Sequence, residues 1–237
     1  MHASAFHAAI VDLDGTMVDT LGDFVVVLHH TLADLGCHPI ELARVDRDFV
    51  AQTVGKGTED LLRRTLAHAW GLPDDAPDAV AAVPEAWQHY QAHYRRLNGA
   101  HAEVFPGVAE GLAQLRELGV PLACLTNKPT AFAEQLLERK GLRTHFQHVF
   151  GGDAFARKKP DPLPLLKTCE ALATEPSRTL MVGDSSNDAQ AAQAAGCAIL
   201  LVRYGYNHGH PIEAVPALAH VDRLDQVDWA ALFTPAR

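Results

Sequence analysis

Val11-Asp12-Leu13-Asp14-Gly15-Thr16 is the stretch that decides the fold, and it directly follows a short apolar run from Ala8 to Val11. An apolar run bounded by Asp and Gly predicts a buried strand with polar chemistry at its end. Residues two apart in a strand share a face, so we expect Asp12 and Asp14 to face one small volume, with Gly15 allowing a tight turn. Because two crowded carboxylates repel, this volume requires a shared proton, a basic neighbour or a hard divalent cation.

Strands and helices alternate through much of the remaining chain. Apolar runs predict further strands at Val120 to Leu125, Thr179 to Val182 and Ala198 to Val202, with helical patterns between them. This alternation predicts an α/β fold with a Rossmann-like parallel sheet core and helices on both faces. Ligands bind beyond the carboxyl ends of the strands in such a sheet, so polar residues at those ends are candidate site residues.

A block without a convincing strand follows the first motif. Apolar residues recur at helical spacing in three parts of it, Leu21 to Leu35, Leu61 to Trp70 and Val80 to Leu97. We therefore expect residues 18–98 to form an inserted all-α cap domain. Residues 1–17 and 99–237 are expected to form the core.

Polar residues follow the predicted strands. Thr126 and Asn127 come after the strand from Val120, and Asp184 and Asp188 come after the strand from Thr179. Lys159 lies in a loop between these segments, next to another lysine and before a proline. Each residue also has an ordinary structural explanation, because Thr and Asp are common helix caps and most lysine pairs are solvated. Their joint placement at strand ends favours one site.

The first motif resembles that of the haloacid dehalogenase-like superfamily, although Asp-x-Asp-Gly alone is also ordinary turn composition. In that superfamily the first Asp is a phosphoryl-accepting nucleophile and the second an acid/base, which implies these roles for Asp12 and Asp14. The resemblance also implies that Thr126 holds the phosphoryl group. It further implies that Lys159 neutralises the nucleophile and the phosphoryl oxygens.

The same resemblance implies a magnesium site. Asp12, Asp14, Asp184 and Asp188 are its expected ligands, with Asp14 contributing its backbone carbonyl and Asp188 lying in or just behind the coordination shell. Manganese fits the same oxygen ligands. A metal and Lys159 would together screen the approach of an anionic nucleophile to a phosphate dianion.

Several stretches resemble bacterial phosphoglycolate phosphatases more specifically. They are Thr126-Asn127-Lys128-Pro129, Gly151-Gly152-Asp153, Lys158-Lys159-Pro160, Gly183-Asp184-Ser185-Ser186-Asn187-Asp188 with Ala194-Ala195-Gly196-Cys197, and Tyr204-Gly205-Tyr206-Asn207. The similarity implies that Asn127 belongs to the catalytic set. It also implies hydrolysis of 2-phosphoglycolate to glycolate and phosphate through an aspartyl-phosphate on Asp12.

A glycine-flanked loop in the cap is the candidate for substrate recognition. Exposed amides and the Lys56 ammonium, between Gly55 and Gly57, offer a place for an anionic group. We expect these three residues and Thr16 to bind substrate. A surface turn capped by Thr58 is the alternative interpretation of the loop.

Other activities fit parts of the pattern. A phosphatase for another small metabolite would use the same motifs, and a phosphomutase of the same fold would require a sugar bisphosphate. A dehalogenase would use the nucleophile without a metal, and Asp14 and Asp184 argue against it. The remaining alternative is a non-catalytic phosphate-binding module, which retention of the catalytic positions disfavours.

Composition limits the partners. The chain has 237 residues, 48% hydrophobic and 21% charged, with a formal net charge of −9, which favours a globular protein and disfavours nucleic acid or an anionic membrane as partner. A small anionic phosphate ester remains compatible. The four cysteines are scattered, and His208 and His210 lack further ligands at zinc spacing, so we expect free thiols and surface histidines. No membrane span or signal segment is evident, which predicts a cytoplasmic protein; the sequence does not specify an oligomeric state.

Overall fold

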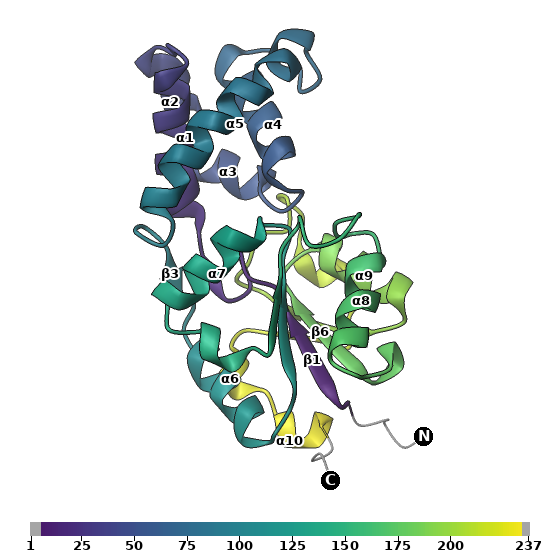
Figure 1. Cartoon of the computed structure of the whole chain (residues 1–237). Helices are drawn as coiled ribbons and strands as arrows, with labels where there is room; N and C mark the ends of the chain where they lie inside the picture. Colours follow the sequence, from purple (N-terminus) through teal and green to yellow (C-terminus); the bar gives the residue numbers. More distant parts are fainter. Residues whose placement is uncertain (1–5, 234–237) are drawn as a thin grey trace.

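A six-stranded parallel sheet forms the centre of the computed structural model, which describes residues 6–233 (Figure 1). The strand order is β5-β4-β1-β6-β7-β8. The strands are β1 (Ala8–Val11), β4 (Leu122–Leu125), β5 (His148–Phe150), β6 (Thr179–Gly183), β7 (Ala198–Val202) and β8 (Ala219–Val221). This sheet confirms the predicted α/β class. Residues 1–5 and 234–237 of the expected core lie outside the described residues.

Strand β1 lies between β4 and β6 and sets the register of the site. Val11 pairs with Cys124 on one side and Val182 on the other. The chain therefore leaves the sheet at the same level in all three strands. All four residues of β1 are buried, as expected for a parallel strand covered on both faces.

Helices cover both faces of the sheet, as Figure 1 shows. They are α6 (Val108–Glu117), α7 (Thr130–Arg139), α8 (Leu163–Ala171), α9 (Ser186–Ala195) and the short C-terminal α10 (Trp229–Leu232). Ala9 and Val11 of β1 belong to the apolar cluster that includes residues of α6 and α7. Ala8 and Ile10 belong to the cluster that includes residues of α8 and α9. Alternate residues of one strand thus face the two helical layers.

Five helices form a cap whose apolar cluster also includes Phe132 and Tyr206 of the core. They are α1 (Leu21–Asp34), α2 (Pro39–Arg44), α3 (Arg47–Thr53), α4 (Thr58–Trp70) and α5 (Pro77–Leu97). Helix α5 packs against α1 and α4, and the cap lies at the end of the sheet opposite α10 (Figure 1). The three longer helices match the predicted ones. The two shorter helices were not predicted, because six or seven residues are too few to show a helical repeat.

A two-stranded antiparallel ribbon joins the cap to the core. It pairs β2 (Val18–Asp19) with β3 (Glu103–Val104). The expectation that residues 18–98 contain only helices is therefore wrong at the first two residues, whose pairing partner is too distant in sequence to be inferred from two residues. Buried Asp23 of α1 also accepts a hydrogen bond from the His101 amide at 2.7 Å. The entering and returning segments are thus fixed to each other.

Two expectations from composition concern the thiols and the membrane. All four cysteines are free; Cys37 is half-buried and the others are buried. Among residues 6–233, no helix combines the length and the apolar character that crossing a membrane requires.

Candidate active site

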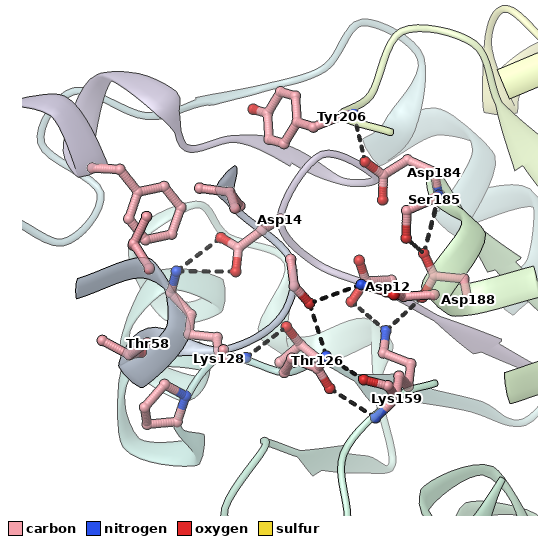
Figure 2. Close-up of a pocket in the computed structure, with 18 of the residues that line it drawn as sticks. Asp12, Asp14, Thr58, Thr126, Lys128, Lys159, Asp184, Ser185, Asp188 and Tyr206 are labelled. Carbon is pink, nitrogen blue, oxygen red and sulfur yellow. Dashed lines mark hydrogen bonds and ion pairs between the residues drawn. The ribbon is translucent and has the colours of Figure 1, made fainter. Parts of the chain in front are cut away.

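A pocket lies where the carboxyl ends of β1, β4 and β6 meet the cap (Figure 2). Its volume is about 630 Å³, part of which is open to solvent. The core contributes predicted site residues, which are Asp12, Asp14, Thr126, Asn127, Lys159, Asp184 and Asp188. The cap contributes an apolar wall and the loop before α4. The structure thus brings together seven of the predicted residues at one sheet edge.

Gly15 allows the first motif to turn beneath this pocket. Its φ is +86°, and a Cβ atom there would lie 2.1 Å from Oδ2 of Asp184, so neither the backbone nor the space accepts a side chain. The next residue, Thr16, is fully buried and donates its hydroxyl to Asp184 Oδ1 at 3.0 Å. Thr16 does not line the pocket. The structure thus shows a contact of Thr16 with Asp184, while the expected contact with substrate stays a prediction.

Lys159 is enclosed by oxygen atoms. Its Nζ lies 2.7 Å from Asp12 Oδ1, 2.7 Å from Asp188 Oδ1 and 2.9 Å from the Leu125 carbonyl (Figure 2). Burial lowers the pKa of this lysine, but the charges of Asp12 and Asp188 outweigh burial and raise the pKa above its ordinary value. Lys159 is therefore a permanently charged group beside the predicted nucleophile.

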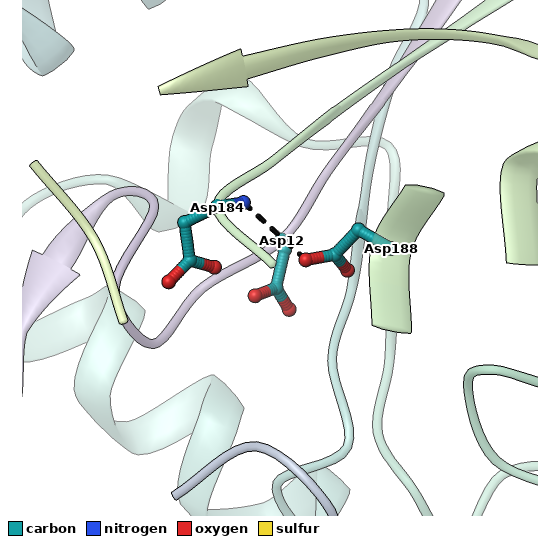
Figure 3. A group of neighbouring side chains, drawn as sticks. All are labelled: Asp12, Asp184 and Asp188. Atoms are coloured by element: carbon teal, nitrogen blue, oxygen red, sulfur yellow. Dashed lines mark hydrogen bonds between the residues drawn. The ribbon is translucent and has the colours of Figure 1, made fainter. Parts of the chain in front are cut away.

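Asp12, Asp184 and Asp188 form a compact acidic group (Figure 3). One carboxylate oxygen of each lies within 4.8 Å of those of the other two, and all three residues are buried. Burial, together with Asp188 and against the effect of Lys159, raises the pKa of Asp12 to about 7. Burial and the two other carboxylates raise the pKa of Asp184 well above its ordinary value. Three carboxylates share one lysine here, so their charge and their oxygen donors fit a hard divalent cation.

Asp188 has partners for both of its oxygens. Oδ1 contacts Lys159, while Oδ2 accepts hydrogen bonds from the Ser185 hydroxyl at 2.7 Å and the Ser185 amide at 3.2 Å. These contacts form a capping box at the start of α9. Asp188 therefore both caps helix α9 and belongs to the acidic group. Asp184 also has a partner at each oxygen, Thr16 at Oδ1 and Tyr206 at Oδ2, whereas among the described residues Asp12 has a hydrogen-bond partner only at Oδ1.

Asp14 faces the pocket but contacts a different lysine from Asp12. Its two carboxylate oxygens accept hydrogen bonds from Lys128 Nζ at 2.8 and 3.1 Å (Figure 2). The Asp14 carboxylate is not a member of the acidic group. Lys128 is buried, although its role was not predicted; the only signal for it was its position in the Thr126-Asn127-Lys128-Pro129 stretch.

Asn127 connects three parts of the site. Its Nδ2 donates to the carbonyls of Lys159 and of Gly55 in the cap, each at 2.8 Å, and its Oδ1 accepts from the Lys159 amide at 3.0 Å. Every polar atom of this side chain is thus used. The neighbouring Thr126 Oγ1 accepts a hydrogen bond from the Lys128 amide at 3.2 Å.

The cap loop meets the core through its backbone. The Gly55 carbonyl accepts hydrogen bonds from Asn127 and, at 3.3 Å, from Asn187. Gly55 and Gly57 line the pocket as expected, but Lys56 is exposed and does not line it. The loop presents the Gly55 carbonyl to the core and Lys56 to solvent, and the expected contact of Lys56 with substrate stays a prediction. Thr58 is the first residue of α4 rather than its cap.

Tyr206 is a site residue that the sequence patterns did not assign. Its amide donates to Asp184 Oδ2 at 2.6 Å, and its hydroxyl donates to Asp19 Oδ1 at 2.6 Å. It therefore connects the acidic group to the ribbon at the base of the cap. Near it, His208 contacts Asn187, and no second group of metal-ligating side chains at coordinating distance occurs within residues 6–233.

Comparisons with known proteins agree with this geometry. A family model described as haloacid dehalogenase-like hydrolase matches residues 9–202. A plasmid phosphoglycolate phosphatase of Cupriavidus necator is 42% identical, covering 97% of this chain and 94% of the relative. A phosphoglycolate phosphatase of Thiobacillus denitrificans is 38% identical, covering 90% and 92%.

A solved structure shows the same architecture. The crystal structure of a predicted phosphoglycolate phosphatase from Haemophilus somnus has a TM-score of 0.83 and 28% identity, covering 93% of this chain and 95% of that one. Together with the family model, this similarity confirms the resemblance inferred from the motifs. The chain belongs to the haloacid dehalogenase-like hydrolases.

Proposed function

We propose that the protein is a magnesium-dependent phosphatase that hydrolyses 2-phosphoglycolate to glycolate and phosphate. The observation that carries this proposal is that two carboxylates, two residues apart in the sequence, contact different lysines. Asp12 contacts Lys159 within the acidic group, whereas Asp14 contacts Lys128 outside it. This difference supports a role in attack for Asp12 and a role in proton transfer for Asp14. The names of the relatives support the substrate.

The proposed reaction has two halves. In the first, a carboxylate oxygen of Asp12 forms a bond to phosphorus while the ester P–O bond breaks, and Asp14 gives a proton to the departing glycolate oxygen. In the second, Asp14 takes a proton from a water molecule whose oxygen attacks phosphorus. The bond between phosphorus and Asp12 then breaks, which releases phosphate and restores Asp12.

The surrounding residues stabilise charge and hold the reacting groups. Lys159 stays beside Asp12 and stabilises the negative charge of the phosphoryl oxygens. Thr126 lies at the same sheet edge and is proposed to hold those oxygens through its hydroxyl. Magnesium bound by Asp12 and Asp184, with the Asp14 carbonyl as a further proposed ligand, would supply positive charge to the phosphoryl group.

The cap lines part of the pocket through Gly55 and Gly57. We propose that residues 18–98 act as the cap that closes over this substrate, with Gly55 and Gly57 at its edge. We also propose a cytoplasmic enzyme, for which the four free thiols are support.

A phosphate-release assay tests the function. Purified protein is given 2-phosphoglycolate, 2-hydroxyethyl phosphate and an aryl phosphate, each with magnesium, with manganese or with a chelator. We expect metal-dependent release and the highest kcat/KM for 2-phosphoglycolate, with Asp12→Asn lowering turnover to background. The control is Lys167→Met, which changes an exposed lysine on α8. Equal kcat/KM for all three esters would reject the substrate, and full activity of Asp12→Asn would reject the nucleophile.

A further inference from the structure

Lys128 is a second buried lysine in the pocket, and the reaction described above gives it no role. It comes from the loop after β4, and its ammonium lies against Asp14 rather than against the acidic group. Because Asp14 is the proposed proton donor to the leaving oxygen, this ammonium lies on the leaving-group side of the pocket. Lys159 occupies the phosphoryl side.

The surroundings of the Lys128 ammonium combine one carboxylate with two aromatic rings of the cap. Nζ lies 2.8 and 3.1 Å from the two oxygens of Asp14. It also lies 4.6 Å from the centre of the Phe24 ring and 4.9 Å from the centre of the Tyr94 ring. Such distances are typical of cation–π contacts, which hold an ammonium in place.

The hydrogen-bonding capacity of this lysine is not exhausted. An ammonium has three donors, and within the described residues Lys128 Nζ donates only to the two oxygens of Asp14. Lys159, by contrast, has three separate oxygen acceptors. Lys128 therefore has one donor free for a further anionic partner.

The other residues that line the pocket limit which chemical groups can bind Lys128. Phe24, Leu61, Tyr90 and Phe132 line the pocket and are apolar or aromatic. Lys56, the other lysine considered for substrate recognition, is exposed. Since Lys159 is already paired on the phosphoryl side, Lys128 is the buried cation that faces an anionic group on the leaving group. The short distance from Lys128 to Asp14 requires that this group lie within a bond or two of the ester oxygen.

We propose that Lys128 selects the leaving group by binding a carboxylate carried on the carbon next to the ester oxygen. This inference rests on the proposed function, since 2-phosphoglycolate is such an ester. The carboxylate takes the free donor of Lys128, while Phe24 and Tyr94 hold the ammonium and exclude water from it. A neutral leaving group of the same length offers no charge to this ammonium and is discriminated against.

Kinetics on two isosteric esters test the proposal. The kcat/KM values for 2-phosphoglycolate and for 2-hydroxyethyl phosphate, which replaces the carboxylate by a neutral alcohol, are measured for wild type, Lys128→Met, Lys128→Arg and the control Lys167→Met. We expect Lys128→Met to lower kcat/KM for 2-phosphoglycolate by about 100-fold or more and for the neutral ester by less than about tenfold. Lys128→Arg should keep part of the preference, and Lys167→Met all of it.

Two results would overturn this role. Equal losses on both esters would mean that Lys128 acts only by positioning Asp14, and unchanged kinetics would mean that it does not contact substrate. If the wild-type protein shows no preference for 2-phosphoglycolate, the proposed substrate is rejected instead. This result is obtained before any Lys128 variant is made. The two failures are therefore distinguishable.

A crystal structure of Asp12→Asn with magnesium and 2-phosphoglycolate tests the contact without any change at Lys128. This experiment also applies if Lys128→Met does not fold. A substrate carboxylate oxygen within about 3.2 Å of Lys128 Nζ supports the proposal. A carboxylate bound by other side chains, or facing solvent, overturns it.

Discussion

The phosphoryl side and the leaving-group side of the pocket are built differently, although each pairs a buried lysine with an aspartate of the first motif. All three oxygen partners of Lys159 belong to the core. Lys128 binds a core carboxylate but is covered by Phe24 and Tyr94 of the cap. The proposed phosphoryl chemistry thus uses groups of the core alone. The proposed recognition of the leaving group uses a surface completed by the cap.

The largest expected effect lies on the phosphoryl side. Lys159→Met removes the charge beside Asp12, so kcat/KM should fall by about 10³-fold or more on 2-phosphoglycolate and on 2-hydroxyethyl phosphate alike. Steady-state kinetics on the two esters measure this. A fall in kcat/KM on 2-phosphoglycolate alone would contradict the distinction between the two sides, because it would give Lys159 the role assigned to Lys128. Lys167→Met is again the matched control.

Asn127→Asp should have the next largest effect, because Asn127 is hydrogen-bonded to the Lys159 backbone and to the cap loop. The replacement cannot donate to the carbonyls of Lys159 and Gly55, and it adds a charge beside the acidic group. We expect kcat/KM to fall by about 10- to 100-fold on both esters. Asn127→Ala, which removes the donors without adding charge, should cause a smaller fall. An unchanged kcat/KM in both variants would contradict the connecting role.

Phe24→Leu should have a smaller effect that is limited to the leaving-group side. The substitution removes one aromatic face from the Lys128 ammonium while keeping an apolar side chain. We expect KM for 2-phosphoglycolate to rise by about three- to tenfold, with kcat nearly unchanged and little effect on the neutral ester. The control is Phe49→Leu, which changes a cap aromatic stacked on His68 away from the pocket. A fall in kcat on both esters would indicate a general packing defect.

The smallest expected effect concerns stability without metal. The folded-state pKa of Asp12 is raised to about 7 from an ordinary value of 3.8, so the folded protein binds this proton more tightly than the unfolded chain. The free energy of unfolding therefore falls as pH rises from about 4 to about 7. Above about pH 7 the full loss of stability from the ionised Asp12 remains. Asp12→Asn lacks this cost and should be more stable than wild type at pH 8 by about 1 to 4 kcal/mol.

Urea unfolding in the presence of a chelator, at pH 5 and at pH 8, measures the difference. The advantage of Asp12→Asn should shrink at the lower pH, where wild-type Asp12 takes up its proton. Added magnesium should stabilise wild type at pH 8 more than it stabilises the variant. An advantage that is the same at both pH values would show that Asp12 titration is not its cause.

The sheet and the phosphoryl side followed from the sequence, and the leaving-group side did not. Polar residues after buried parallel strands must meet at one edge, which is why Asp12, Thr126 and Asp184 could be predicted together. Lys128 could not, because its role depends on how rings from α1 and α5 cover it, and a single lysine carries no periodic signal. The exposure of Lys56 could not be predicted either, because the direction in which a loop residue faces is set by packing.

The Gly55 carbonyl accepts hydrogen bonds from both Asn127 and Asn187 of the core. Since the cap loop is held through a main-chain oxygen, the hydrogen bonds that fasten it to the core require no particular side chain in that loop. Substitutions of exposed loop residues such as Lys56 therefore leave these hydrogen bonds in place. The loop can thus vary in sequence while its attachment to the core is retained.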